Sequence, residues 1–156
     1  MSNRDPFSAD PDSSPASTAS DAIAGSINRV EQLPLHRRAI LVVEDEYLIA
    51  EDLAVILKDA GADVIGPADS LPRGIWLASE TERIEAALLN VFLNGVTVFP
   101  LVDQLRTRGI PMLFLTGYDD GDIPDQYSDI RRCEKPGGMA RVVEELRALI
   151  EAPAAT

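Results

Sequence analysis

The chain has 156 residues, of which 46% are hydrophobic, and a formal net charge of −12. This composition is sufficient for one globular domain with a substantial core and excludes a chain that is disordered throughout. The excess of acidic groups argues against nucleic acid and anionic membranes as partners, because both attract lysine and arginine.

The cysteine and histidine content narrows the class of protein further. The only cysteine, Cys133, cannot form a disulfide within the chain, and the only histidine, His36, lies far from it in sequence. We therefore interpret Cys133 as a small buried hydrophobic residue of a reduced, cytoplasmic protein, not as a metal ligand or nucleophile. No stretch has the ~18 apolar residues of a membrane span, and the N-terminus has no apolar signal core.

The segment before the first predicted strand has two parts. Residues 1–19 consist mainly of Ser, Asp, Pro and Ala, which predicts a disordered tail. Residues 20–36 are predicted to form a helix and a linker. In the helix, over residues 20–33, apolar side chains recur at helical spacing, at Ile23, Ile27, Val30 and Leu33. This helix either lies on the domain or frays in solution, or it docks on a partner or a second copy. We expect residues 1–36 to be dispensable for folding.

Strand-like and helix-like patterns alternate over residues 37–151. Apolar runs predict five strands, at residues 39–43, 63–66, 86–90, 112–115 and 130–134. Helical spacing predicts helices over 47–60, after Ser70, over 98–108 and over 138–151. Residues 119–129 contain glycine and proline, so a helix there should be short or irregular. Only a tail, residues 152–156, follows, so we expect no output domain.

This alternation predicts βαβ units, and hence an α/β fold with a parallel sheet and helices on both faces. Ligands of such sheets bind at the carboxyl edge. Polar side chains follow four of the predicted strands at this edge, namely Glu44 and Asp45, Asn90, Thr116, and Lys135. Asn94 and Gly95 then turn the chain shortly after Asn90. We expect these side chains to form one site.

The adjacent acidic residues Glu44 and Asp45 allow two interpretations. Carboxylates packed together repel, and a hard divalent cation between them relieves the repulsion. Acidic residues at the start of a helix are also stabilised by the helix dipole without any metal. The presence of Asn90 and Lys135 at the same edge favours a pocket of the metal-binding type.

Four motifs together resemble the receiver domain of two-component response regulators. They are Val43-Glu44-Asp45-Glu46, Leu89-Asn90-Val91-Phe92-Leu93-Asn94-Gly95, Phe114-Leu115-Thr116-Gly117-Tyr118 and Lys135-Pro136. The third is similar to the alphaproteobacterial branch known for a Phe-Ala-Thr-Gly-Gly-Tyr motif. The resemblance implies a flavodoxin-like, doubly wound sheet of strand order 2-1-3-4-5. It also implies as partners a histidine kinase, a phosphotransfer protein or another receiver.

The resemblance also assigns roles to individual positions. It implies a Mg²⁺ site formed by Glu44, Asp45, the side chain at position 90 and the backbone carbonyl of Phe92. It places Thr116 and Lys135 at the phosphoryl group. Without phosphate, we expect Lys135 to pair with Glu44 or Asp45 and to hydrogen-bond Asn90.

The chain departs from the family at the position that accepts the phosphoryl group. The family has an aspartate there, and this chain has Asn90. An amide nitrogen is not nucleophilic, because resonance withdraws its lone pair, so Asn90 cannot carry an acyl phosphate. Its carbonyl oxygen can still reach a cation, but the missing negative charge predicts weak Mg²⁺ binding.

Four more positions have a predicted role. Arg132 stands where the family has its switch aromatic, so Tyr118 takes over that role. Phe92 replaces a small polar residue and either packs on Val96 or Tyr118, or forms a lid or a partner contact. Pro136 resembles a cis proline of the family. Trp76 is interpreted as part of the core.

Three functions are possible for a receiver-like chain with asparagine at position 90. The favoured one is a stand-alone pseudo-receiver, which binds proteins through residues 118–129, the fifth strand and the last helix, and which can form a homodimer there. The alternative is an ordinary phosphoryl-accepting regulator in which Asn90 is an engineered substitution. The third is a metal-dependent phosphatase, which we reject because no His, Ser or Cys is positioned as nucleophile or base.

Overall fold

The computed structural model describes residues 29–117, 123–135 and 137–152, and the chain divides into two units, Met1–Gln32 and Leu33–Thr156. In the first unit, residues 29–31 are helical, as predicted for the end of the helix over 20–33. The remainder of that helix and the tail 1–19 lie outside the described residues, as do Tyr118 and Pro136. No helix in the described ranges combines the length and apolar character needed to cross a membrane.

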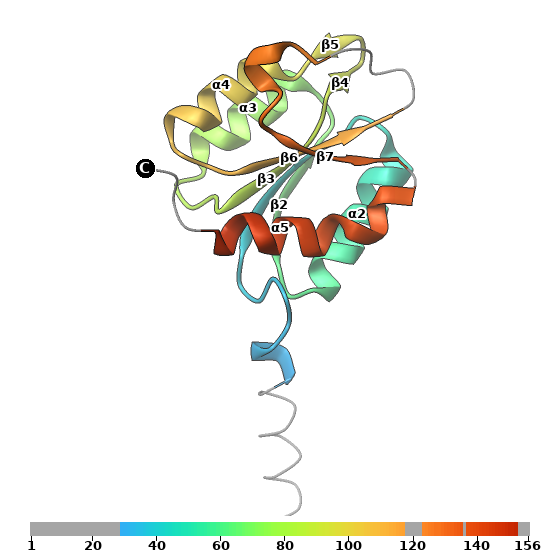
Figure 1. Ribbon diagram of the computed structural model, residues 1–156, viewed down its shortest axis with the longest axis vertical. Coiled ribbons are helices and arrows are strands. Elements are labelled where there is room, and N and C mark those ends of the chain that lie inside the picture. Colours follow the sequence, from blue (N-terminus) through green and yellow to red (C-terminus); the bar gives the residue numbers. More distant parts are fainter. Residues whose placement is uncertain (1–28, 118–122, 136, 153–156) are drawn as a thin grey trace, which may run out of the picture. The chain divides into compact units, whose positions relative to one another are not determined.

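A parallel sheet of five strands forms the centre of the second unit (Figure 1). In sheet order the strands are β2 (Asp63–Ala68), β1 (Ala39–Val43), β3 (Ala86–Asn90), β6 (Met112–Thr116) and β7 (Arg131–Glu134). Numbered by the five predicted strands this is 2-1-3-4-5, so the flavodoxin-like order is confirmed. Strands β1, β3 and β6 are buried at every position, which explains their continuous apolar runs.

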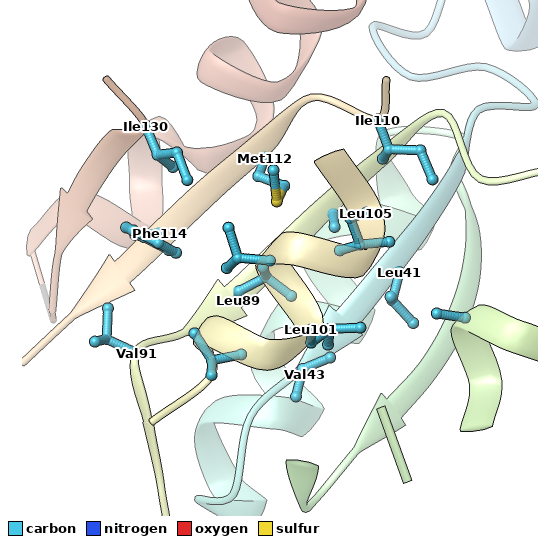
Figure 2. Close-up of a cluster of buried hydrophobic side chains, with 14 of the residues drawn as sticks. Leu41, Val43, Leu89, Val91, Leu101, Leu105, Ile110, Met112, Phe114 and Ile130 are labelled. Carbon is cyan, nitrogen blue, oxygen red and sulfur yellow. The ribbon is translucent and has the colours of Figure 1, made fainter. Parts of the chain in front are cut away.

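Helices cover both faces of the sheet (Figure 1). Helices α2 (Tyr47–Asp59) and α5 (Val142–Glu151) lie on one face, and α3 (Leu71–Glu80) and α4 (Phe99–Thr107) on the other. Each face has its own hydrophobic cluster, because successive strand side chains point to opposite faces. Figure 2 shows the cluster under α4, where Leu101 and Leu105 meet Leu41, Leu89 and Phe114 of the sheet.

Two short elements were not predicted. A hairpin of β4 (Phe92–Leu93) and β5 (Val96–Thr97) follows β3, and its turn is formed by Asn94 and Gly95, both with positive φ. The last helix, predicted over 138–151, is instead a 3-10 turn η2 (Gly137–Arg141) followed by α5. The expectation of a short helix within 119–129 agrees with the 3-10 turn η1 (Asp125–Tyr127).

The compact unit starts earlier than the predicted boundary at residue 37. Leu35 is fully buried, and its backbone N–H donates to the carbonyl of Ala60 at 2.9 Å. The N–H of Arg37 donates to the carbonyl of Gly61, also at 2.9 Å. A Cβ on Gly61 would lie 2.9 Å from the Cα of His36, so residues 33–37 pack directly on the end of α2. Residues 33–36 therefore pack with the domain, and we expect their deletion to cost stability, in contrast to the expectation that residues 1–36 are dispensable.

Two aromatic side chains lie opposite to where the sequence analysis placed them. Trp76 was interpreted as core, but 56% of it is exposed on α3. Tyr127 belongs to the segment that was proposed as a binding face, but only 4% of it is exposed. Its ring stacks on Phe99 of α4, with centroids 4.4 Å apart. Tyr127 is therefore a core residue and cannot anchor an interface without unfolding η1.

Candidate functional site

Buried polar side chains gather at the carboxyl edge of the sheet. Glu44, Asn90 and Thr116 are the buried residues with a carboxyl, amide or aliphatic hydroxyl group in the described part of the chain. Glu44 directly follows β1, and Asn90 and Thr116 are the last residues of β3 and β6. Because β1 pairs with β3 and β3 pairs with β6, these strand ends are neighbours. The predicted convergence of these side chains is thus a consequence of the sheet order.

The side chain of Asn90 is held between two carboxylates. Its Nδ2 donates to Oε1 of Glu44 at 3.1 Å and to Oδ1 of Asp45 at 2.9 Å. Carboxylates only accept hydrogen bonds, so this contact fixes the orientation of the amide, with its two N–H groups toward the acidic pair. The amide nitrogen of Asn90, and not its carbonyl oxygen, faces Glu44 and Asp45.

Lys135 pairs with Glu44, one of the two partners that were expected. Its Nζ lies 3.0 Å from Oε1 and 2.9 Å from Oε2 of Glu44, and only 10% of the lysine side chain is exposed. Glu46 is a more distant neighbour at 3.8 Å, and the expected hydrogen bond from Lys135 to Asn90 is not formed. Burial raises the pKa of Glu44 above its ordinary value, although Lys135 acts in the opposite direction.

Asp45 connects this site to the hairpin turn. While its Oδ1 accepts from Asn90, its Oδ2 accepts the backbone N–H of Asn94 at 2.9 Å. The side chain of Asn94 in turn donates to the carbonyl of Asp69 at 3.3 Å. Asn94 was expected as a turn residue, and its contact with Asp45 was not predicted. No sequence signal links the two, because they are 49 positions apart.

The other predicted site residues contribute less to the pocket. The hydroxyl of Thr116 lies 3.5 Å from the carbonyl of Cys133 on β7, at the limit of a hydrogen bond. Cys133 is buried as predicted, and burial raises the pKa of its thiol. Phe92 is half-buried in β4 and packs against the cluster under α4. Arg132 is exposed on β7.

The arrangement does not fit a Mg²⁺ ion. The family resemblance implies a Mg²⁺ ion at an acidic pocket, and the carboxylates that Asn90 contacts here are those of Glu44 and Asp45. Across the described ranges, no group of three or more His, Cys, Asp and Glu residues is placed to hold a metal. Both oxygens of Asp45 already accept N–H groups, and Glu44 is paired with Lys135. The side chain that would add a third oxygen, Asn90, presents its nitrogen instead.

Comparisons with known proteins identify the family of this fold. The chain is 31% identical over 112 residues to the phyllosphere-induced regulator PhyR of Methylorubrum extorquens, a match that covers 68% of this chain and 42% of PhyR. It is 32% identical to SdrG from Sphingomonas melonis Fr1, whose solution structure it matches with a TM-score of 0.65 over 73% of this chain and 97% of that one. The chain belongs to the response regulator receiver domains. No protein-family model matches it.

The extent of the matches limits what they show. The receiver domain of the hybrid histidine kinase CckA matches with a TM-score of 0.60 at 22% identity, over 72% of this chain and 99% of that one, and it supports the fold. The chain spans less than half the length of PhyR. The matches to receiver domains indicate a module of response regulator signalling.

Proposed function

We propose that this receiver domain is a signalling module that is not phosphorylated at Asn90 and that acts by binding other proteins, without enzymatic activity. The observation that carries this proposal is the position of the Asn90 amide. Its nitrogen is resonance-stabilised and donates to Glu44 and Asp45, so neither its electrons nor its orientation suit attack on a phosphoryl donor. Lys135 supports the proposal, because it is already paired with Glu44.

The first test is chemical. The protein is incubated with acetyl phosphate and MgCl₂, and its intact mass is measured. We expect no added phosphoryl group at Asn90, because an amide does not form an acyl phosphate. Asn90→Asp is the matched control, since it restores the nucleophile at the same place. A stoichiometric adduct mapped to Asn90 would refute the proposal, and an adduct mapped to Asp45 would move the acceptor to that residue.

We propose that the protein is cytoplasmic and that it binds a histidine kinase, a phosphotransfer protein or another receiver there. Two surfaces support binding. Exposed large hydrophobic residues are concentrated on α2, at Tyr47, Leu48 and Val55. Beside them lies a groove of about 590 Å³ that Glu51, Asp69 and Arg73 help to line.

The second surface is β7, an edge strand of the sheet, which exposes Arg131 and Arg132 next to α5. Edge strands and exposed arginines favour association, including a homodimer.

The second test is binding. The immobilised protein is exposed to a lysate of its source, and the retained proteins are identified by mass spectrometry. We expect it to retain one of the three partner classes without phosphate, and we expect either Leu48→Ser/Val55→Ser or Arg132→Glu to lose that partner. All variants are first shown to unfold at the temperature of the original protein. If only phosphorylated Asn90→Asp retains a partner, the chain is an ordinary receiver that the asparagine has inactivated.

The finer family assignment is also a proposal. The segment Phe114-Leu115-Thr116-Gly117 resembles the motif of the alphaproteobacterial branch described above, with Leu115 in place of its alanine, and the relatives PhyR and SdrG are similar in sequence over the same domain. We propose that the chain belongs to this branch. Tyr118, which completes the motif, lies outside the described residues.

A further inference from the structure

We propose that the Asn90 amide takes the place that a divalent cation has between paired carboxylates, so that this site is held together without metal. The inference deepens the proposed function and rests on it, since it concerns the same asparagine. The group of residues involved, called here the amide bracket, consists of Lys135, Glu44, Asn90, Asp45 and Asn94.

Charges and hydrogen-bond donors are balanced within the amide bracket. Glu44 and Asp45 place two negative charges side by side at the end of β1, and such a pair is unfavourable unless something between the two carboxylates attracts both. The –NH₂ group of Asn90 has two N–H donors, and it contacts one oxygen of each carboxylate, at 3.1 and 2.9 Å. Lys135 supplies the only full positive charge within 4 Å of Glu44 in the described residues.

The carboxylates of Glu44 and Asp45 have little acceptor capacity left for a cation. Oδ1 of Asp45 accepts from Asn90, and Oδ2 accepts from the backbone of Asn94. Oε1 of Glu44 accepts from Asn90, from Lys135 and from the backbone N–H of Glu46. Oε2 of Glu44 is buried without a hydrogen bond of good geometry, but it lies 2.9 Å from the ammonium group of Lys135. A metal ion would have to displace these donors.

The amide bracket also positions another part of the fold. Through Asp45 it holds the backbone of Asn94, which has a φ of 53° and starts the turn between β4 and β5. The hairpin leads directly into α4, and the N–H of Val98 donates to the carbonyl of Val91 across its base at 2.9 Å. Asp45 of the acidic pair is therefore a structural element in this chain, because it connects the hairpin turn to the end of β1.

The test compares thermal unfolding in EDTA and in excess MgCl₂. For the protein itself we expect the same melting temperature in both solutions. For Asn90→Asp, which replaces two donors with a third carboxylate, we expect a melting temperature lower by roughly 5–10 °C in EDTA, with much of the loss recovered in MgCl₂. Gln104→Glu is the matched control, because it makes the same amide-to-carboxylate change in an exposed hydrogen bond on α4. It should show no dependence on MgCl₂.

A second measurement keeps the inference testable if Asn90→Asp does not fold in EDTA. Amide hydrogen exchange of the original protein in EDTA should show protection of the Asn94 N–H, and MgCl₂ should not change it. The inference is overturned if MgCl₂ raises the melting temperature of the original protein by several degrees, or if the Asn94 amide exchanges like a free one. These results are independent of phosphorylation, so a protein stabilised by Mg²⁺ but not phosphorylated would overturn this inference and leave the proposed function intact.

Discussion

A chain that begins at residue 37 is expected to lose several kcal/mol of stability relative to one that begins at Leu33. Leu35 is fully buried in the cluster beneath α2 and α5, and removal of a buried leucine side chain costs about 2–5 kcal/mol. The deletion also removes the hydrogen bond from Leu35 to Ala60, and a net hydrogen bond contributes about 0.5–1.5 kcal/mol. Since domains of this size have a total stability of roughly 5–15 kcal/mol, the loss should be large.

Urea unfolding of the two truncated chains measures this difference directly. Leu35→Ala in the full chain isolates the side chain from the backbone contacts and should cost about 2–5 kcal/mol by itself. Val30→Ala is the matched control, because Val30 is an apolar residue that is half exposed, and its truncation should change the stability by less than about 0.5 kcal/mol. Equal stability of the chains that begin at 33 and at 37 would show that residues 33–36 are not part of the domain.

The missed start of the domain illustrates which features the sequence can predict. The five strands and the buried faces of the helices follow from periodic apolar patterns, and the residues of α4 that recur at helical spacing, Leu101, Val102 and Leu105, are buried. Leu35 is a single buried residue in an irregular segment, where there is no period to detect. The strands β4 and β5 have two residues each, too few for an alternation to appear.

The candidate site likewise combines features that the sequence predicts with features that it does not. Parallel strands bring their carboxyl ends to one edge, so the sequence predicts that Glu44, Asp45, Asn90 and Lys135 converge. The order of the strands came from the family resemblance and not from spacing. The direction of the Asn90 amide and the contact between Asp45 and Asn94 depend on side-chain geometry across loops, which no pattern in the sequence encodes. The sequence therefore predicts the members of the site and not which of their atoms face one another.

Because Tyr127 is buried, we expect its substitution to have a second large effect on the stability of the domain. Its ring is nearly parallel to that of Phe99, at an interplanar angle of 8°, and the guanidinium of Arg106 lies 5.6 Å from the ring centroid. Its hydroxyl donates to Oδ1 of Asp103 at 2.9 Å. These contacts attach η1 to α4 through one side chain, so loss of the ring should destabilise the domain and not only a surface.

We expect Tyr127→Ala to lower the free energy of unfolding by about 3–5 kcal/mol, as for other buried aromatic residues, and Tyr127→Phe to lower it by only about 1 kcal/mol. The phenylalanine variant keeps the stacked ring and loses the hydrogen bond to Asp103, so the difference between the two variants measures the packing of the ring. Urea unfolding followed by circular dichroism gives both values. If Tyr127→Ala is nearly as stable as the original protein, Tyr127 is not a core residue and becomes available again as an interface anchor. Loss of a partner in Tyr127→Ala would therefore report unfolding of the domain, whereas Arg132 is exposed on β7 and its substitution tests the surface itself.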